Sequence, residues 1–355
     1  MKIRWVWPAL IVLGSQTGAA WADTVGERAI AGYIAPAMQR YAEAAPAMGD
    51  ALSAYCRGEA DRERLDAAFG ALAQSWARIE FLRFGPLVEA NRYERSFFWP
   101  DPRGVTQRQV QAALARQDPA LVAPGGLAAA SVAVQGIPAL ELVLYLESGG
   151  LASQAPADAD DYRCRYGQAL TTALAGIGRE LAAAWSPGGQ VHEEFAHPGP
   201  DANLYRDDTE VIAELLKAVS GGLHFARDAK LVPALGATAD TARPTRAPLA
   251  RSGMALPAMA AGVRGAGELF AAAGLAPRFE DVQRWMAASV PQQAARIADA
   301  LQTVEPPWAA ALADAGTRSR LAAAAADLQS LKTMLEGPVA EALGVKVGFN
   351  ALDGD

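Results

Sequence analysis

The segment Val134-Gln135-Gly136-Ile137-Pro138-Ala139-Leu140-Glu141-Leu142-Val143-Leu144-Tyr145 decides the fold class expected for this chain. It lies in an apolar run from about Leu127 to Leu146, in which Glu141 is the only charged side chain. The run is long enough to cross a membrane, but the polar and helix-breaking residues in its middle and the lack of basic flanks argue against that. We therefore predict a helix that is buried inside a bundle of helices.

Gly136 and Pro138 predict where this helix begins, because proline suits the first helical turn and its missing N–H costs little there. Glu141 would then lie about one turn inside the helix, where the helix dipole favours a negative charge by roughly 0.3–1 kcal/mol. Burying an unpaired carboxylate costs several kcal/mol, roughly. Glu141 therefore requires a partner, which is either a metal ion or an arginine.

The rest of the chain also favours helix, since alanine dominates it and stretches of strictly alternating polarity are absent. Thr106-Gln107-Arg108-Gln109 has the pattern of a capping box and predicts a helix start. Helical segments are expected at Arg62–Glu89, Asp160–Trp185, Leu204–Pro233, Ser252–Ala273, Arg278–Thr303 and Gly316–Leu343.

The order of these segments predicts the domain organisation. Residues 1–22 read as a signal peptide, with Lys2 and Arg4 before an apolar stretch and Ala20-Trp21-Ala22 as the cleavage site, so we expect a periplasmic protein. A Pro- and Gly-containing break near the middle separates two sets of helices. We predict an all-α fold of two tandem up-and-down helical bundles, residues 23–190 and 204–355, with a linker at 191–203 and a cleft between the bundles.

Cys56 and Cys164 are the only cysteines. In an oxidising compartment such a pair predicts one disulfide, and two free buried thiols are the alternative. A bridge would stabilise the fold by roughly 3–5 kcal/mol in the chain-entropy model.

The net charge limits the classes of molecule that the protein is expected to bind. The whole chain carries −7, and the part after the signal peptide carries −9 because Lys2 and Arg4 are lost with it. An acidic protein is a poor candidate for binding nucleic acid, which requires a basic surface.

The sequence does not contain the common catalytic motifs in a form that would support catalysis. His192-Glu193-Glu194-Phe195-Ala196-His197 is one residue too long for the zinc-peptidase pattern H-E-x-x-H, so one helix face cannot present both histidines. His224 and Asp228 are spaced as a simple hydrogen-bonded pair on a helix. No G-x-S-x-G motif occurs, and Gly265-Ala266-Gly267 follows no predicted strand.

A candidate binding wall lies between Arg78 and Gly104, where arginines alternate with aromatic and acidic residues. Such a mixture is typical of a surface that holds a polar ligand, and an ion-pair network that fastens a loop is the alternative. Its polar members are Glu80, Arg83, Asn91, Arg92, Glu94, Arg95, Asp101 and Arg103, and its aromatic members are Phe81, Phe84, Tyr93, Phe97, Phe98 and Trp99.

Four separate motifs give the chain a resemblance to a known family. They are Phe84-Gly85-Pro86 with Asn91-Arg92, then Phe98-Trp99-Pro100-Asp101-Pro102-Arg103-Gly104, then Ser131–Glu141, and finally Gly348-Phe349-Asn350-Ala351-Leu352-Asp353-Gly354-Asp355. Together they resemble the imelysin family from about residue 28 onward, and its branch of iron-regulated periplasmic proteins most of all.

The resemblance implies two helical bundles, a site at their interface and a role linked to iron acquisition. The motif typical of the family is G-x-H-x-x-E, which here reads Gly136-Ile137-Pro138-Ala139-Leu140-Glu141, with proline in place of histidine. Imidazole is the commonest protein ligand for borderline transition metals such as zinc. A zinc-peptidase site also needs about three protein ligands. The substitution therefore argues against peptidase activity.

Our first hypothesis is a non-enzymatic protein that binds iron, or a small iron-containing ligand, for uptake or handling together with envelope uptake proteins. Oxygen ligands from Glu141 and Glu80 would hold the metal, since ferric iron favours oxygen. The expected cleft residues are Glu141, Gly136, Pro138, Gln135, Glu80, Arg83, Phe84, Asn91, Arg92, Arg95, Trp99, Asp101 and Arg103, with Asn350 and Asp353 closing the other side.

Two alternatives remain. One is a metallopeptidase of the imelysin type. The other is an interaction protein of the cell envelope without a metal, in which Glu141 pairs with an arginine such as Arg83 or Arg95.

Overall fold

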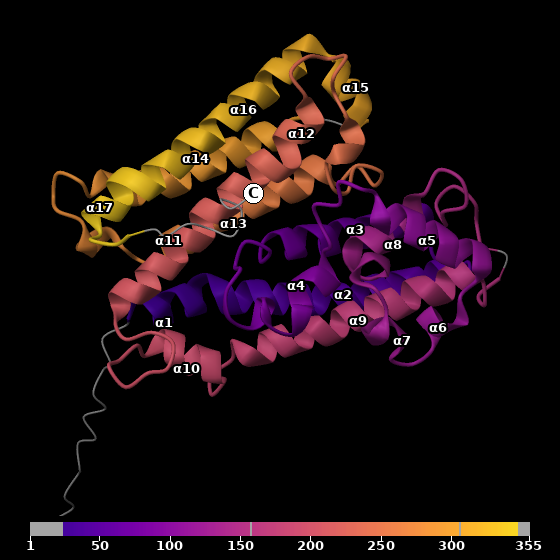
Figure 1. Ribbon diagram of the computed structural model, residues 1–355, viewed down its shortest axis with the longest axis horizontal. Coiled ribbons are helices and arrows are strands. Elements are labelled where there is room, and N and C mark those ends of the chain that lie inside the picture. Colours follow the sequence, from indigo (N-terminus) through magenta and orange to yellow (C-terminus); the bar gives the residue numbers. More distant parts are fainter. Residues whose placement is uncertain (1–23, 157, 305–306, 347–355) are drawn as a thin grey trace, which may run out of the picture.

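The structure is a computed structural model that describes residues 24–156, 158–304 and 307–346. Over these residues all regular elements are helices and no strand occurs. Figure 1 shows two groups of long helices lying side by side, one early and one late in the sequence. The all-α prediction is confirmed. The predicted signal peptide and the motif at the C-terminus lie outside the described residues.

The first group is built around α2, which packs against α3 on one side and α9 on the other, while the short helix α8 packs against α9. Elements labelled η1, η5 and η8 are π-helical, and the other η elements are 3₁₀ turns. The elements before residue 200 are α1 (Val25–Ala29), η1 (Ile30–Ile34), α2 (Ala35–Cys56), α3 (Arg62–Ala77), η2 (Gly85–Leu87), η3 (Glu89–Asn91), α4 (Arg92–Ser96), α5 (Val105–Arg116), α6 (Pro119–Val122), α7 (Gly126–Ala129), η4 (Val132–Val134), α8 (Gly136–Tyr145), α9 (Tyr162–Ala184) and α10 (Gln190–Ala196).

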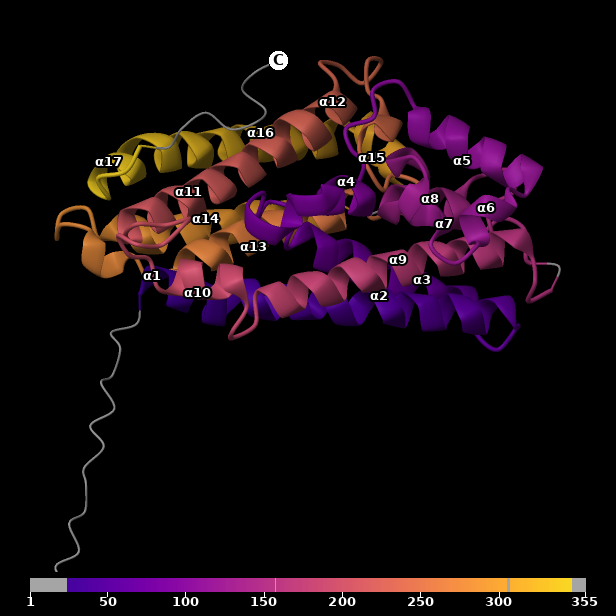
Figure 2. The ribbon, with the colours of Figure 1, turned by 60° about the horizontal axis from the view of Figure 1, so that its bottom comes forward.

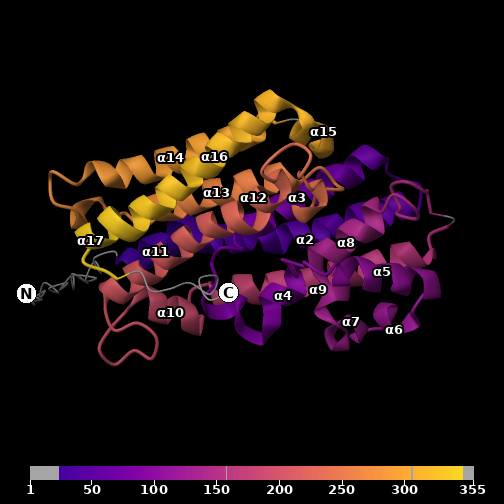
Figure 3. The same cartoon turned by 45° about the horizontal axis from the view of Figure 1, so that its top comes forward.

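The second group is a four-helix arrangement in which α13 packs against α11 and α14, and α16 closes the set against both of them (Figure 3). Its elements are α11 (Asp208–His224), η5 (Phe225–Leu231), α12 (Val232–Leu235), η6 (Pro244–Arg246), α13 (Ala255–Ala272), η7 (Ala276–Arg278), α14 (Trp285–Gln302), α15 (Trp308–Ala313), α16 (Ala315–Met334), η8 (Leu335–Val339) and α17 (Ala340–Ala342).

The long helices agree with the expected segments, and the differences have local causes. The helix expected at Arg62–Glu89 ends at Ala77, and turns lead to Phe84, whose backbone is extended. Gly85 follows in the left-handed region with φ of 54°, and Pro86 comes next. A proline disfavours the helical conformation in the residue before it, so one helix could not run through Gly85 to Glu89. The apolar spacing that continues past Ala77 belongs to turns.

The start of α5 is a second correction. Thr106, which the capping-box pattern placed at the helix start, lies inside the helix. The carboxylate of Asp101 caps it instead, accepting hydrogen bonds from the backbone N–H groups of Val105 (2.9 Å) and Thr106 (2.7 Å). This fixes the loop before α5 to the helix, because two N–H groups that the helix leaves unpaired are satisfied by one side chain.

Helix α10 lies in the segment expected to be a linker and packs against α1, as Figure 2 shows near the start of the described chain. The two groups of helices also share one continuous apolar core. At their contact, the Tyr33 hydroxyl donates to the Arg78 carbonyl (2.7 Å), and α13 passes so close that a Cβ on Gly265 would lie 2.1 Å from that hydroxyl. The division of the chain into two domains stays a prediction.

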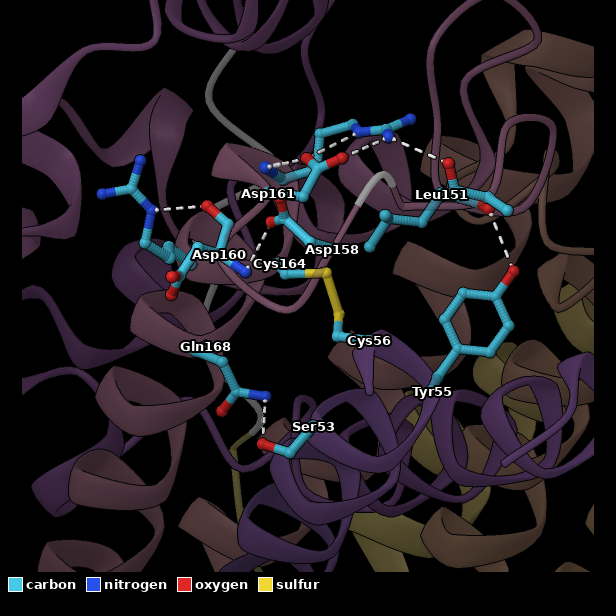
Figure 4. Close-up of a disulfide and its surroundings, with 12 residues drawn as sticks. Ser53, Tyr55, Cys56, Leu151, Asp158, Asp160, Asp161, Cys164 and Gln168 are labelled. Atoms are coloured by element: carbon cyan, nitrogen blue, oxygen red, sulfur yellow. Dashed lines mark hydrogen bonds and ion pairs between the residues drawn. A yellow bond between two sulfur atoms is a disulfide. The ribbon is translucent and has the colours of Figure 1, made fainter. Parts of the chain in front are cut away.

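Cys56 at the end of α2 and Cys164 at the start of α9 form a disulfide, with Cα atoms 6.1 Å apart (Figure 4). Beside it, Gln168 donates a hydrogen bond of 2.7 Å to the Ser53 hydroxyl. The predicted bridge is confirmed, and it pins together the ends of two neighbouring helices.

Among the described residues, no helix is both long enough and apolar enough to cross a membrane.

Candidate functional site

Helix α8 begins where the sequence predicted, at Gly136, with Pro138 in its first turn. Gly136 has a φ of 74°, and a Cβ there would lie 2.4 Å from the carbonyl oxygen of Ser96. Both the left-handed backbone and the close approach of α4 require glycine. This contact sets the position of α8 and therefore of Glu141.

Glu141 is buried, with 5% of its surface exposed. Its Oε1 accepts hydrogen bonds from the backbone N–H (2.9 Å) and the hydroxyl (2.8 Å) of Ser252. Burial raises the pKa of Glu141, and the Ser252 hydrogen bonds and the nearby charge of Arg251 oppose that rise only in part. The partner of the carboxylate is thus a serine, and neither Arg83 nor Arg95 contacts it.

Glu141 lines a cleft of about 630 Å³ between the two groups of helices. One wall comes from α5, α8 and the loop before α5, and the other from η5, α12 and the segment that leads into α13. Of the residues predicted from sequence, the cleft brings together Trp99, Asp101, Pro138 and Glu141. Its remaining polar residues are Thr106, Gln107, Asp228, Thr245, Arg246 and Arg251.

The acidic groups of the cleft are already engaged. Asp101 caps α5, and Asp228 pairs with His224 (3.1 Å) and with Arg227. The predicted pair of His224 and Asp228 is confirmed.

Two arginines supply positive charge. Arg251 donates to the Gln107 side chain (2.9 Å) and so is held beside α5, while Arg246 is exposed and forms no ion pair within the described residues. The cleft therefore brings two guanidinium groups together with a buried carboxylate whose pKa is raised by burial.

Two buried polar atoms of the lining residues have no hydrogen-bond partner among the residues that the structure describes. They are the indole Nε1 of Trp99 and the hydroxyl of Thr106. Buried polar groups in folded proteins are nearly always hydrogen-bonded. Two such atoms in one cleft favour a bound ligand or ordered water there.

Glu80 does not line the cleft that contains Glu141. It forms an ion pair with Lys230 on η5, and both side chains are buried. This pair lines two smaller cavities that do not include Glu141. The structure therefore does not bring together the two carboxylates expected to share a metal. No group of three or more His, Cys, Asp or Glu within the described ranges has the geometry of a metal site.

The remaining wall residues mostly fasten the loop between α3 and α5. Arg92 binds Glu180 of α9 (2.7 Å) and the Pro86 carbonyl (2.9 Å). Arg95 donates to the Gln135 side chain (3.4 Å), and Gln135 in turn donates to the Ala130 carbonyl (2.9 Å). These contacts correspond to the alternative in which the arginines hold a loop in place.

Three other predicted wall residues also lie away from the cleft. Phe84 stacks on Phe195, with ring centroids 5.6 Å apart. Asn91 and Arg103 are exposed. The predicted cleft residues Asn350 and Asp353 lie outside the described part of the chain.

With this geometry established, comparison with known proteins identifies the family. The imelysin family model matches residues 29–335. The chain belongs to the imelysin family. No curated protein sequence matches the chain.

Two solved structures of imelysin-like folds resemble this one. An imelysin-like protein from Psychrobacter arcticum 273-4 aligns with a TM-score of 0.71 and 20% identity, covering 91% of this chain and 96% of the other. A protein assigned as an iron-regulated protein A precursor from Parabacteroides distasonis ATCC 8503 aligns with a TM-score of 0.68 and 14% identity, covering 90% and 96%. At these identities the likeness concerns the fold, which the chain shares over nearly its whole length.

The sequence did not single out Arg246, Arg251 or Ser252 for the cleft, nor Lys230 as the partner of Glu80. Lys230 lies in a predicted helix whose sequence shows only an ordinary amphipathic pattern. Arg251 and Ser252 stand before a predicted helix, where a serine ordinarily suggests a cap. No local pattern connects either position with Glu141 or Glu80.

Proposed function

We propose that this protein is an exported, non-enzymatic protein that binds iron as a small anionic chelate in the cleft that Glu141 lines, for uptake or handling in the periplasm. The observation that carries the proposal is the cleft of about 630 Å³ that a buried carboxylate lines together with two arginines. A guanidinium recognises carboxylate-rich ligands through paired hydrogen bonds.

The side chains that line the cleft favour binding of a chelated form of iron over binding of a bare iron ion. A hard metal ion held by protein alone needs several oxygen ligands, and no suitable group of three occurs among the described residues. A chelate brings its own ligands. Arg246 and Arg251 would bind its negative charge, and the unpaired N–H of Trp99 would donate to it.

The periplasmic location rests on two features of the chain. The predicted signal peptide at residues 1–22 directs export. The Cys56–Cys164 disulfide fits an oxidising compartment. The link to iron is supported by the name of the Parabacteroides relative of similar fold.

The test is equilibrium dialysis of protein recovered from the periplasmic fraction, with ferric citrate, citrate alone and a ferrous salt as probes. Wild type should retain iron from ferric citrate. Arg251→Met should lose about tenfold or more in affinity, since a hydrogen bond to a charged group contributes about 1.5–3 kcal/mol. Glu141→Ala should lose affinity as well, because it removes the acceptor that holds Ser252, and with it the neighbouring Arg251, in place. The exposed Glu341→Gln serves as the matched control.

Equal binding by wild type and both cleft variants would reject the cleft as the site. Tight binding of the ferrous salt without citrate would reject the chelate. Loss of binding in Glu341→Gln would show that the assay responds to net charge alone.

A further inference from the structure

A second cavity, of about 110 Å³, lies between α3, α11, η5 and α13 and is separate from the Glu141 cleft. Its inner end holds the buried pair of Glu80 and Lys230, and its outer end holds Lys217, which is exposed. Phe225 and Met259 are among its apolar walls. The cavity therefore runs from the protein surface to a buried ion pair.

One of the two carboxylate oxygens of Glu80 lacks a hydrogen-bond partner among the described residues. Lys230 binds Oε1, while Oε2 is buried and has no hydrogen-bond partner among the described residues. Lys230 is also satisfied by the faces of Phe97 (5.6 Å to the ring centre) and Phe225 (5.0 Å). An unpaired buried acceptor is costly, and a donor placed in the cavity that Glu80 lines would satisfy it. A neutral O–H fits better than an ammonium group, because the charge of Lys230 beside it repels a second cation.

Arg83 supplies the complementary group. Its guanidinium lies between the rings of Tyr93 (4.1 Å) and Phe225 (4.4 Å) and donates to the Tyr93 hydroxyl. Within the described residues no carboxylate forms an ion pair with it, although it is only partly exposed. A guanidinium held in this way is oriented to receive a carboxylate. Lys217 adds a second positive charge, and Glu214, whose pKa is raised by burial, also lines the cavity.

The π-helical form of η5 is what places two of these groups together. Phe225 and Lys230 are five residues apart, which in an α-helix at about 100° per residue would turn them roughly 140° from each other. The wider turn of a π-helix, which joins residues five apart by a hydrogen bond, brings both to the cavity. Such π segments are frequent at functional sites.

We propose that this cavity binds a short hydroxycarboxylate. Its hydroxyl donates to Oε2 of Glu80, its carboxylate contacts Arg83 and Lys217 nearer the surface, and its hydrocarbon part lies against Phe225 and Met259. The volume of about 110 Å³ is smaller than the roughly 150 Å³ cavity that holds a benzene molecule. The cavity therefore admits only a small molecule.

The test is titration of the full, iron-free protein with lactate, followed by NMR and calorimetry. Propanoate lacks the hydroxyl, 2-propanol lacks the carboxylate and alanine replaces the hydroxyl by an ammonium group. Lactate should bind saturably, and each of the other three should bind about tenfold or more weakly, the loss expected for one such contact. The reporting amides should include those of Phe81, Phe225 and Lys230.

Variants separate this site from the cleft and from instability. Glu80→Gln removes the acceptor charge, and Ala218→Leu fills the cavity without touching Glu80 or Lys230, so both should abolish saturable binding of lactate. Glu141→Gln should bind lactate as wild type does, which keeps this result independent of iron binding in the cleft.

Three outcomes would overturn the proposal. They are equal affinity for all four probes, unchanged lactate binding in Ala218→Leu, and a crystal soaked in lactate that shows ordered water alone in the cavity. Tighter binding of alanine than of lactate would overturn the assignment of a neutral donor.

Discussion

Glu141 on α8 accepts two hydrogen bonds from Ser252, a residue 111 positions later in the chain. The contact joins the buried helix of the first group to the segment that enters α13 in the second. It gives Oε1 of the carboxylate two donors, and it forms part of the cleft between the two groups. Several consequences of this contact and of the neighbouring ones can be measured.

Replacing Ser252 by alanine removes the hydroxyl donor and keeps the backbone one. Because a buried carboxyl group loses one of its two donors, the variant should lose about 1–3 kcal/mol of unfolding free energy in urea titrations. In a Glu141→Gln background the loss should be smaller. Ser330→Ala, on the exposed face of α16, provides the control, and an equal loss in both backgrounds would mean that the hydroxyl does not act on Glu141.

The stability of the protein should depend on pH through Glu141. Burial raises its pKa in the folded state, so the folded protein keeps this proton to higher pH than the unfolded chain does. Stability is consequently lost as pH rises above the pKa of an ordinary glutamate. Glu141→Gln should therefore gain stability relative to wild type between pH 4 and pH 7, as followed by urea unfolding at each pH. A difference that stays constant over this range, or that runs in the opposite direction, would contradict the raised pKa.

The pair of Glu80 and Lys230 should show strong coupling. Lys230→Met leaves the Glu80 carboxylate buried without its counter-ion, which should cost about 3–5 kcal/mol. The double variant Glu80→Gln, Lys230→Met removes both charges and should recover much of that loss. Arg264→Met, which removes an ion pair on the surface, should change stability by less than about 1 kcal/mol. A double-mutant cycle with additive effects would show that the two side chains do not interact.

The disulfide should stabilise the protein through the long loop that it closes. Cys56 and Cys164 are 108 positions apart, for which the chain-entropy model gives roughly 3–5 kcal/mol. The double variant Cys56→Ser, Cys164→Ser should unfold at correspondingly lower urea concentration, and reducing agent should shift wild type alone. A wild type that keeps its unfolding midpoint after complete reduction would contradict this role.

Asp101 should affect both α5 and the cleft. Asp101→Ala removes the cap of α5 and should cost about 0.5–2 kcal/mol, as for other N-caps. Asp101→Asn retains an acceptor oxygen and should cost less. Since Trp99 lies in the same loop, iron retention from ferric citrate should also weaken in Asp101→Ala. Loss of retention without loss of stability would point to a direct contact with the ligand instead.

Much of the local structure was predictable because its causes lie close together in the sequence. Gly136 and Pro138 predicted the start of α8, since both act on the backbone of their own turn. The long helices followed from composition and spacing. The errors arose where a local pattern allowed two structures, as beyond Ala77, where helical spacing continued into turns, and at Thr106, where Asp101 supplied the cap.

The site was predictable only in part. Trp99, Asp101, Pro138 and Glu141 do line one cleft, and all four lie within the motifs on which the family resemblance rests. Glu80, from the same wall segment, faces a different cavity. Neighbours in sequence along irregular backbone can point to different sides, and no periodic pattern reports which side.

The sequence by itself determined the helical fold, the start of the buried helix and the cysteine pair, because propensity, proline geometry and the number of thiols act locally or allow few choices. The tertiary structure decided which partner each buried charge received. Ser252 reaches Glu141 across 111 residues and Lys230 reaches Glu80 across 150. Such pairings depend on how whole helices pack against one another, and in η5 on a π-helical turn that brings Lys230 and Phe225 to the same side.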